Sequence, residues 1–110
     1  MEHGELLGSL EHIVLLALVQ LGGTAHGALI RREIETRTTR DLSIGAIYAT
    51  LERLQEKGYV SSTLGDPTPE RGGRAKRLFC LEPAGKRSLQ VSARTLRSMG
   101  FGVNPGWGTT

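Results

Sequence analysis

The stretch "DLSIGAIYATLERLQEKGYV", residues 41–60, decides the fold because it predicts a helix with a defined beginning and end. Ser43 is a favourable N-cap residue, since its hydroxyl can accept a hydrogen bond from a backbone amide that has no partner within the helix. Apolar residues follow at helical spacing, and Gly58 ends the helix because glycine adopts a left-handed backbone without a steric penalty. The opposite face carries small residues in its first turns, which lets this helix approach another surface closely.

Two further helices are predicted upstream, over Ser9–Gln20 and Gly27–Arg37. The first ends at a Gly-Gly pair, and the second ends in "TRTTRD", where Thr and Asp side chains compete for backbone hydrogen bonds. The first helix is apolar nearly all round, because Leu15, Leu16 and Val19 lie outside its main apolar stripe. Such a helix must be covered on more than one side, and a domain of 110 residues is too small to do this alone. We therefore expect a partner chain to complete the cover.

Two short strands are predicted next, over Tyr59–Leu64 and Arg74–Leu81. The loop "GDPTPERGG" joins them as a hairpin, because its Pro and Gly content is typical of turns. Side chains alternate between the two faces of a strand, so Phe79 and Leu81 point inward together with Arg77.

A last helix is predicted from Pro83 to about Met99, because proline suits the first helical position. Charge is distributed unevenly along the chain. Residues 71–110 hold 8 Lys and Arg against 1 Glu, whereas residues 1–70 hold 6 Lys and Arg against 10 Asp and Glu. The basic second part predicts a polyanionic partner, nucleic acid before membrane.

The order of these elements, three helices and then a hairpin with a basic loop, is that of a winged helix-turn-helix. The predicted fold class is therefore mainly α with a small β-hairpin, followed by one C-terminal helix. In helix-turn-helix proteins the recognition helix, here the third, enters the major groove. The loop "RGGRAKR", residues 71–77, would be the wing, whose cations displace counterions from phosphates. A solvated surface loop is the alternative for a charge run taken by itself.

Composition argues against several other classes of protein. The longest apolar run, Ile13–Val19, is too short to cross a bilayer, and no secretory signal is present, so we expect a cytoplasmic protein without membrane contact. The single cysteine, Cys80, excludes an intrachain disulfide, and an inert thiol is favoured over a redox switch. His3, His12 and His26 are not spaced like metal ligands, so neither a metal nor a cofactor is expected. No catalytic constellation is visible, so we do not expect an enzyme.

Four segments together resemble the PadR family of bacterial transcriptional regulators, in its short form with a single C-terminal helix. They are "LGSLEHIVLLAL", "AHGALIRREIE", "LSIGAIYATLERLQEKGYV" and "RGGRAKRLFCLEPAG", and they cover about residues 7–99. The resemblance implies a homodimer that binds a near-palindromic operator in double-stranded DNA, usually as a repressor, in the bacterial cytoplasm at the nucleoid. Some relatives bind flat aromatic effectors at the dimer interface, but this chain is poor in aromatic residues and gives no hint of a pocket.

The chain departs from the family pattern at three points. Glu82 stands where relatives commonly have threonine; it caps a helix less well but suits the positive end of the helix dipole. Ala28 stands where many relatives have tyrosine, so any role of that ring is absent. The last helix is too short for a long coiled-coil dimer arm.

The predicted DNA contacts lie on the third helix and the wing. Tyr48 matches a DNA-contacting tyrosine of the family, although spacing alone favours a core aromatic with its hydroxyl at the edge. Arg53 is either a phosphate contact or an ordinary solvated residue. The predicted DNA-binding residues are Ser43, Gly45, Ala46, Tyr48, Ala49, Thr50 and Arg53 in the helix, and Arg71, Gly72, Gly73, Arg74 and Lys76 in the wing.

The family resemblance also implies that the last helix pairs with the partner's first helix. The predicted interface residues are Leu10, Ile13, Val14, Ala17, Leu89, Ala93 and Leu96. Residues 1–82 would then form the winged helix-turn-helix, 83–100 the dimerisation helix packed on it, and 101–110 a flexible tail. The alternative function is a protein–protein adaptor without specific DNA binding, because winged helices serve both purposes.

Overall fold

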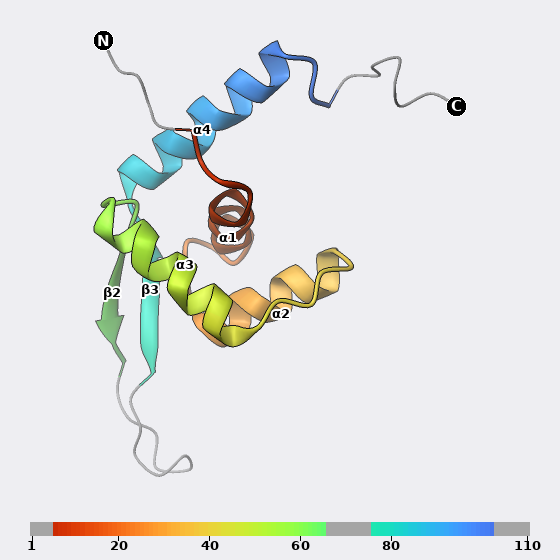
Figure 1. Ribbon diagram of the computed structural model, residues 1–110. Helices are drawn as coiled ribbons and strands as arrows, with labels where there is room; N and C mark the ends of the chain where they lie inside the picture. The colour runs from red at the N-terminus through yellow and green to blue at the C-terminus, as the bar shows by residue number, and fades with distance from the viewer. Residues whose placement is uncertain (1–5, 66–75, 103–110) are drawn as a thin grey trace.

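The computed structural model describes residues 6–65 and 76–102. Within these residues the chain forms four helices and three short strands (Figure 1). In chain order they are α1 (Ser9–Gln20), β1 (Thr24–His26), α2 (Gly27–Arg37), α3 (Ile44–Glu56), β2 (Val60–Leu64), β3 (Arg77–Leu81) and α4 (Pro83–Ser98). The predicted fold class and all four predicted helices are confirmed.

The ends of α3 are formed by the residues that the sequence indicates. The Ser43 hydroxyl accepts a hydrogen bond from the backbone amide of Ala46 at 3.0 Å. Gly58 closes the helix with a φ of 80°, a left-handed conformation that residues with a Cβ adopt at a cost. Between these ends, the apolar stripe is fully buried at Ile47, Leu51 and Leu54.

The sheet has three described strands, one more than the predicted hairpin. Its order is β1-β3-β2, with both pairs antiparallel and Ala25 opposite Phe79. The sequence did not indicate β1, because alternation does not show in a strand of three residues. β2 begins at Val60, one residue after the predicted Tyr59, and Arg74 lies outside the described residues.

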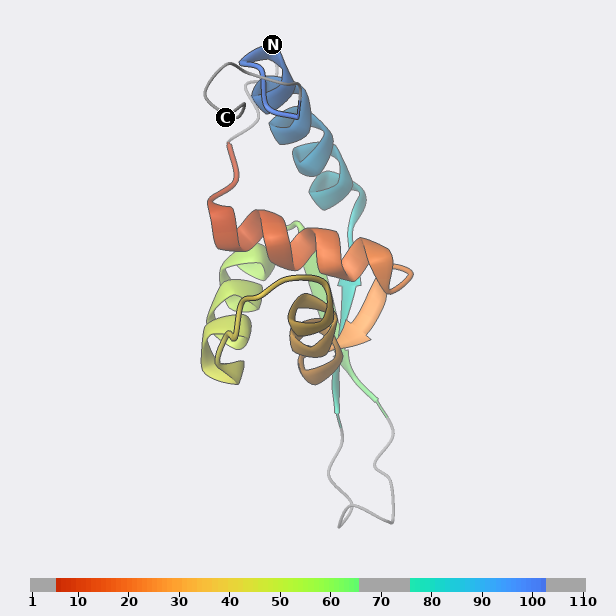
Figure 2. The same cartoon turned by 90° about the vertical axis from the view of Figure 1, so that its right-hand side faces the viewer.

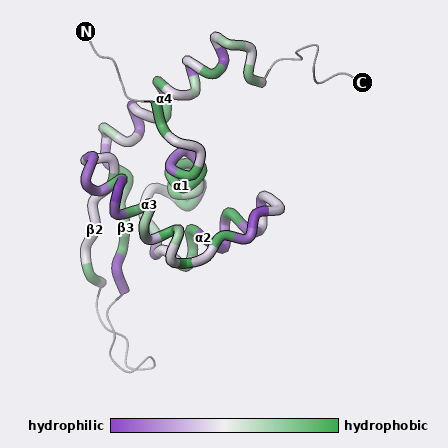
Figure 3. The backbone as a smooth tube through the Cα atoms, viewed as in Figure 1, coloured by the Kyte–Doolittle hydropathy of each residue, from purple (hydrophilic) through white to green (hydrophobic). Residues whose placement is uncertain are grey.

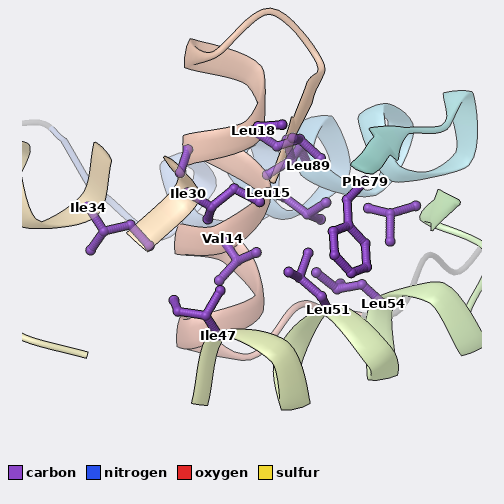
Figure 4. Close-up of a cluster of buried hydrophobic side chains, with 13 residues drawn as sticks. Val14, Leu15, Leu18, Ile30, Ile34, Ile47, Leu51, Leu54, Phe79 and Leu89 are labelled. Atoms are coloured by element: carbon purple, nitrogen blue, oxygen red, sulfur yellow. The ribbon is translucent and has the colours of Figure 1, made fainter. Parts of the chain in front are cut away.

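α1 lies at the centre of the protein and contacts α2, α3, α4 and β3. Figure 3 shows hydrophobic residues gathered along it. The buried core takes side chains from every helix and from β3 (Figure 4). The labelled members in that view are Val14, Leu15, Leu18, Ile30, Ile34, Ile47, Leu51, Leu54, Phe79 and Leu89. Burying each large apolar side chain contributes about 1.5–3 kcal/mol, so this cluster supplies the main stabilisation of the fold.

The burial pattern of α1 corrects part of the predicted dimer interface. Val14 has no exposed surface and Ala17 only 5%, because both pack into the protomer's own core. Leu89 on α4 is likewise buried, at 7% exposure. Val14 therefore has no surface left for a partner, and the prediction is wrong there. Leu16 and Val19, which were not in the predicted interface, are 45% and 41% exposed.

A close contact to the backbone of Tyr59 sets the position of α4. A Cβ at Gly85 would lie only 2.3 Å from the carbonyl oxygen of Tyr59, so glycine is needed at this contact. Glu82, the residue before the helix, makes no side-chain cap and instead accepts a hydrogen bond from the Ser61 hydroxyl at 2.6 Å. From this anchored start, α4 extends away from the other elements (Figure 2).

Candidate nucleic-acid interface

Two features lie on the same side of the protein: the N-terminal end of α3, and the end of the β2–β3 hairpin where β2 finishes at Leu64 and β3 begins at Arg77 (Figure 1). α4 lies on the opposite side. At this end of α3, Ser43, Gly45 and Ala49 are exposed and Ala46 is half-buried. Small side chains leave the helix accessible to a close partner. A helix with such a face can enter a groove about 12 Å wide, which is the width of the major groove of B-DNA.

Thr50 is not part of this exposed face, and its prediction as a DNA contact is wrong. Its side chain has no exposed surface. Its hydroxyl donates to the carbonyl of Ala46 at 2.8 Å and accepts from the Arg53 guanidinium at 3.2 Å. The sequence did contain a pattern that indicates burial of Thr50, because positions 47, 50 and 54 are spaced by three and four residues and so share one face of the helix. Threonine is polar, and for that reason it was assigned to the exposed face.

Tyr48 combines features of both of its predicted roles. The residue is half-buried, and its ring packs against Phe79 with centroids 5.9 Å apart. The ring also covers Gly27 at the start of α2, where a Cβ would lie 2.7 Å from the tyrosine Cζ. The ring is thus held by the core at the edge of the exposed face, and DNA contact by Tyr48 stays a prediction.

The Arg53 guanidinium lies close to a buried carboxylate on α1, that of Glu11. Glu11, whose side chain is 8% exposed, accepts from the Lys57 ammonium at 2.9 Å and from the Gly8 amide at 3.1 Å, and Arg53 Nε lies 3.9 Å away. Burial raises the pKa of Glu11, but these hydrogen bonds and the two cations outweigh it and hold the pKa below its ordinary value of 4.5. The pairing joins the end of α3 to the start of α1. About half of the Arg53 side chain stays in solvent, so its phosphate contact stays a prediction.

Arg77 connects the sheet to α3, a role that the sequence did not indicate. Its guanidinium donates to Glu52 at 2.6 Å and Gln55 at 3.1 Å on α3, and to Ser62 at 3.2 Å on β2. It also lies over the ring of Phe79, 4.8 Å from the centroid, which confirms the predicted inward direction. The hydrogen bond from Arg77 lowers the pKa of Glu52, and the charge of the guanidinium adds to this effect. Arg77 therefore neutralises a carboxylate on the helix proposed to meet DNA.

Five of the predicted DNA contacts belong to the wing. Arg71, Gly72, Gly73 and Arg74 lie outside the described residues. Lys76 is described and exposed, and its carbonyl accepts a hydrogen bond from the Gly65 amide at 2.7 Å, which continues the pairing of the hairpin one residue beyond Leu64 and Arg77.

Other chemistry is sparse in the described segments. No cluster of three or more His, Cys, Asp and Glu residues there could hold a metal ion. Cys80 is half-buried, and the Thr24 hydroxyl lies 3.6 Å from its sulfur. Among the helices described, none has both the length and the apolar character needed to span a bilayer.

Residues 15–91 match the model of the transcriptional regulator PadR-like family, which is more than half of the chain. The chain belongs to this family. The resemblance inferred from the sequence is thereby confirmed, and the chain is a PadR-like winged-helix protein. Members of the family regulate transcription and are not enzymes.

One curated relative of this PadR-like chain is a 37.1 kDa protein of uncharacterized function in transposon TN4556 of Streptomyces fradiae. The two are 36% identical over 84 residues, which is 76% of this chain. The match takes up 22% of the relative, so the chain spans about a fifth of that protein's length.

Three solved structures are similar to the PadR-like chain. F93 from STIV, a winged-helix DNA-binding protein, has a TM-score of 0.67 at 18% identity, over 84% of this chain and 92% of F93. A PadR family regulator from Clostridium difficile R20291 has a TM-score of 0.69 at 20% identity, over 84% and 91% of the two chains. A transcriptional regulator from Clostridium thermocellum has a TM-score of 0.69 at 19% identity, over 86% and 91%. At these identities the likeness shows a shared winged-helix fold.

Proposed function

We propose that this PadR-like protein is a homodimeric repressor that binds a near-palindromic operator in double-stranded DNA. One observation carries the proposal. The N-terminus of α3 has small, exposed residues, and it lies on the same side of the protein as the end of the hairpin at Leu64 and Arg77 (Figure 1). In this arrangement α3 enters the major groove and the wing lies against the DNA backbone. The wing contacts are Arg71, Gly72, Gly73, Arg74 and Lys76, of which Lys76 is exposed at the hairpin base.

The proposed interface reads sequence without long polar side chains at the tip of α3. Gly45, Ala46 and Ala49 cannot form the bidentate hydrogen bonds that distinguish guanine or adenine strongly. Recognition then depends on methyl contacts to thymine, on Tyr48 and on the shape of the DNA. Two such helices in a dimer would read half-sites about one helical turn apart.

Support for the homodimer comes from apolar surface that the protomer leaves uncovered on α1 and α4. Leu16 and Val19 on α1 are 45% and 41% exposed, and Leu96 and Met99 at the end of α4 are 38% and 84% exposed. Apolar surface of this kind on two neighbouring helices marks an interaction site. A self-complementary contact through a two-fold axis would cover it on both protomers.

Two grooves lie on either side of Leu16, and we propose that a helix of the partner chain binds there. A groove of about 420 Å³ between α1 and α4 is lined in part by Leu16 and Ala93, and one of about 250 Å³ between α1 and α2 is lined in part by Leu16 and Ile13. We expect the apolar side of the partner's α4, with its Leu96, to occupy this region. Sedimentation at micromolar concentration tests the expectation, and a stable monomer would contradict it.

Footprinting of the purified protein on the promoter of its own gene is the direct test of operator binding. Two variants probe the role of α3, Ala46→Glu and Ala49→Glu, because each places a carboxylate where phosphates and base edges approach. Thr95→Glu is the matched control, since Thr95 is exposed on α4 at the opposite end of the protein. We expect the α3 variants to lose operator binding with unchanged helicity and dimerisation, and the control to keep it.

Native operator affinity in both α3 variants would show that this helix is not the reader. The protein–protein adaptor function would then be favoured. Absence of salt-dependent binding to any duplex would lead to the same conclusion.

A further inference from the structure

The groove of about 250 Å³ between α1 and α2 has an aliphatic wall, made by Ile13, Leu16, Ala17 and Ile34. Leu16 keeps 45% of its surface exposed, so part of this wall is open to solvent. Pockets at protein interfaces commonly hold one buried anchor residue, and tryptophan is enriched among such anchors. The groove has room for one aromatic side chain of this kind.

The polar side chains around the same groove are already paired with one another. Arg37 forms an ion pair with Glu33 and donates a hydrogen bond to Gln20 Oε1 at 3.3 Å. The Thr38 hydroxyl donates to the carbonyl of Ile34 at 2.8 Å. Because the two charges offset each other, a charged occupant would lose hydration without gaining a new ion pair. The groove therefore favours an uncharged, apolar occupant.

The C-terminal end of α4 redirects the chain and leaves apolar surface open. The amide of Gly100 donates to the carbonyl of Arg97 and the amide of Phe101 to that of Leu96, both at 2.9 Å. Gly100 has a φ of 100°, so this end is a Schellman motif. Met99 and Phe101 are 84% and 67% exposed. Apolar surface thus continues past the last turn of the helix.

The sequence that follows α4 is uncharged and contains aromatic residues. Residues 101–110, "FGVNPGWGTT", include no Asp, Glu, Lys or Arg, and they hold Phe101 and Trp107, two of the five aromatic residues of the chain. Segments that remain in solvent are typically charged and poor in aromatic residues. Glycines on both sides of Trp107 allow the backbone to approach another surface closely. This composition indicates a segment that binds a protein surface through Trp107.

The α1–α2 groove of the same protomer is poorly placed for this segment, because α4 and α2 lie on opposite sides of α1 (Figure 2). The partner's α4, proposed above to bind beside Leu16, would bring its own C-terminal end to the groove instead. Trp107 follows Leu96 by eleven residues, which span up to about 35–40 Å when extended. That length is sufficient, because the groove beside α4 and the groove beside α2 share Leu16.

We propose that the segment after α4 crosses to the other protomer, where Trp107 docks in the partner's α1–α2 groove. This docking rests on the proposed homodimer and adds an exchanged anchor to it. The indole ring lies against the aliphatic wall of the groove, and its N–H donates to the partner's Glu33. A buried indole N–H usually has an acceptor, and a carboxylate can accept several hydrogen bonds. By symmetry, each dimer contains two such contacts.

Fluorescence of the full chain tests the proposal directly, because Trp107 is its only tryptophan. Under conditions where sedimentation shows a dimer, we expect an emission maximum at a shorter wavelength than that of free tryptophanamide. Thr38→Glu places a longer, charged side chain in the groove and should move the emission back to that of an exposed indole. Thr39→Glu is the matched control, since Thr39 is the next exposed threonine and does not line the groove; it should leave the emission unchanged. Circular dichroism should show native helicity in both variants.

A mixed dimer distinguishes exchange from docking within one protomer. The Thr38→Glu chain is refolded with an excess of Trp107→Phe chain, so that each tryptophan belongs to a protomer with a blocked groove and faces a partner with an open one. Exchange predicts that the short-wavelength emission returns in this mixture. Docking within one protomer predicts that the emission remains that of an exposed indole.

Three results would overturn the proposal while leaving the homodimer intact. The first is a dimer in which Trp107 emits like an exposed indole. The second is an equal effect of Thr38→Glu and Thr39→Glu, which would place Trp107 outside this groove. The third is exposed emission in the mixed dimer. A monomer in sedimentation would instead contradict the homodimer itself, and the exchange with it.

Discussion

Replacing Arg77 with Gln removes the side chain that holds β2 and β3 against α3. The change deletes the hydrogen bonds to Gln55 and Ser62 and the contact with the face of Phe79. The hydrogen bonds contribute about 1 kcal/mol together at this partly exposed site, and a cation–π contact contributes about 0.5–1 kcal/mol. The Glu52 pair is solvated and is left out of this figure. We therefore expect the free energy of unfolding to fall by about 1–2 kcal/mol.

Thermal unfolding followed by circular dichroism measures this loss, which corresponds to a decrease in melting temperature of roughly 5–15 °C for a domain of this size. Lys76→Gln is the matched control, because Lys76 is exposed, directly precedes Arg77 and carries the same charge. It should change the free energy of unfolding by less than about 0.5 kcal/mol.

DNA binding separates the two residues in the opposite way. The salt slope is the change in the logarithm of the duplex-binding constant per unit change in the logarithm of the salt concentration. Lys76→Gln should reduce its magnitude by about 0.9, the value for one phosphate contact. Arg77→Gln should weaken operator binding with little change in slope, because Arg77 is engaged within the protein. An Arg77→Gln protein with native stability, or with the larger loss of salt slope, would refute this account and make Arg77 a DNA contact.

Three further predictions concern the wing, the buried carboxylate and the start of α4. Arg71→Ala with Arg74→Ala should weaken binding to all duplexes similarly and lower the salt slope by about one or two units; an unchanged slope would mean a solvated loop. Because the pKa of Glu11 is lowered on folding, its contribution is present above about pH 4.5 and is lost as the pH falls through the folded-state value. Glu11→Gln should cost about 2 kcal/mol in the free energy of unfolding at pH 7 and much less near pH 3, as chemical denaturation would show; an equal cost at both pH values would contradict the pairing with Lys57. Gly85→Ala should destabilise the protein by about 1–3 kcal/mol, because a rigid backbone carbonyl lies 2.3 Å from the new Cβ; a melting temperature within error of the native protein would contradict this contact.

Local patterns in the sequence were sufficient for the helices and for the family. Ser43, Gly58 and the apolar stripe between them define α3 through interactions that span three or four residues, so periodicity reveals them. The same holds for Pro83 at the start of α4 and for the exposed small residues of α3. The alternation that turned Phe79 and Arg77 inward was equally local.

The candidate site was predicted less completely, because burial depends on neighbours in space. Thr50 looked like a surface residue, yet α3 packs with that side against the core, where its hydroxyl bonds the preceding turn. Val14 looked available to a partner chain, yet the protomer's own helices cover it. The sequence did not predict β1, because three residues are too few to show the alternation of a strand. The structure identifies it by the pairing of Ala25 with Phe79.

The sequence by itself thus determined the order of the elements, the ends of α3 and membership of the PadR-like family, because these depend on neighbouring residues and short motifs. The tertiary structure alone decided which distant side chains meet. Glu11 with Lys57 and Arg77 with Glu52 are pairs 46 and 25 residues apart in the chain. Such contacts follow from the faces that the helices and sheet turn toward one another, and no local pattern records them.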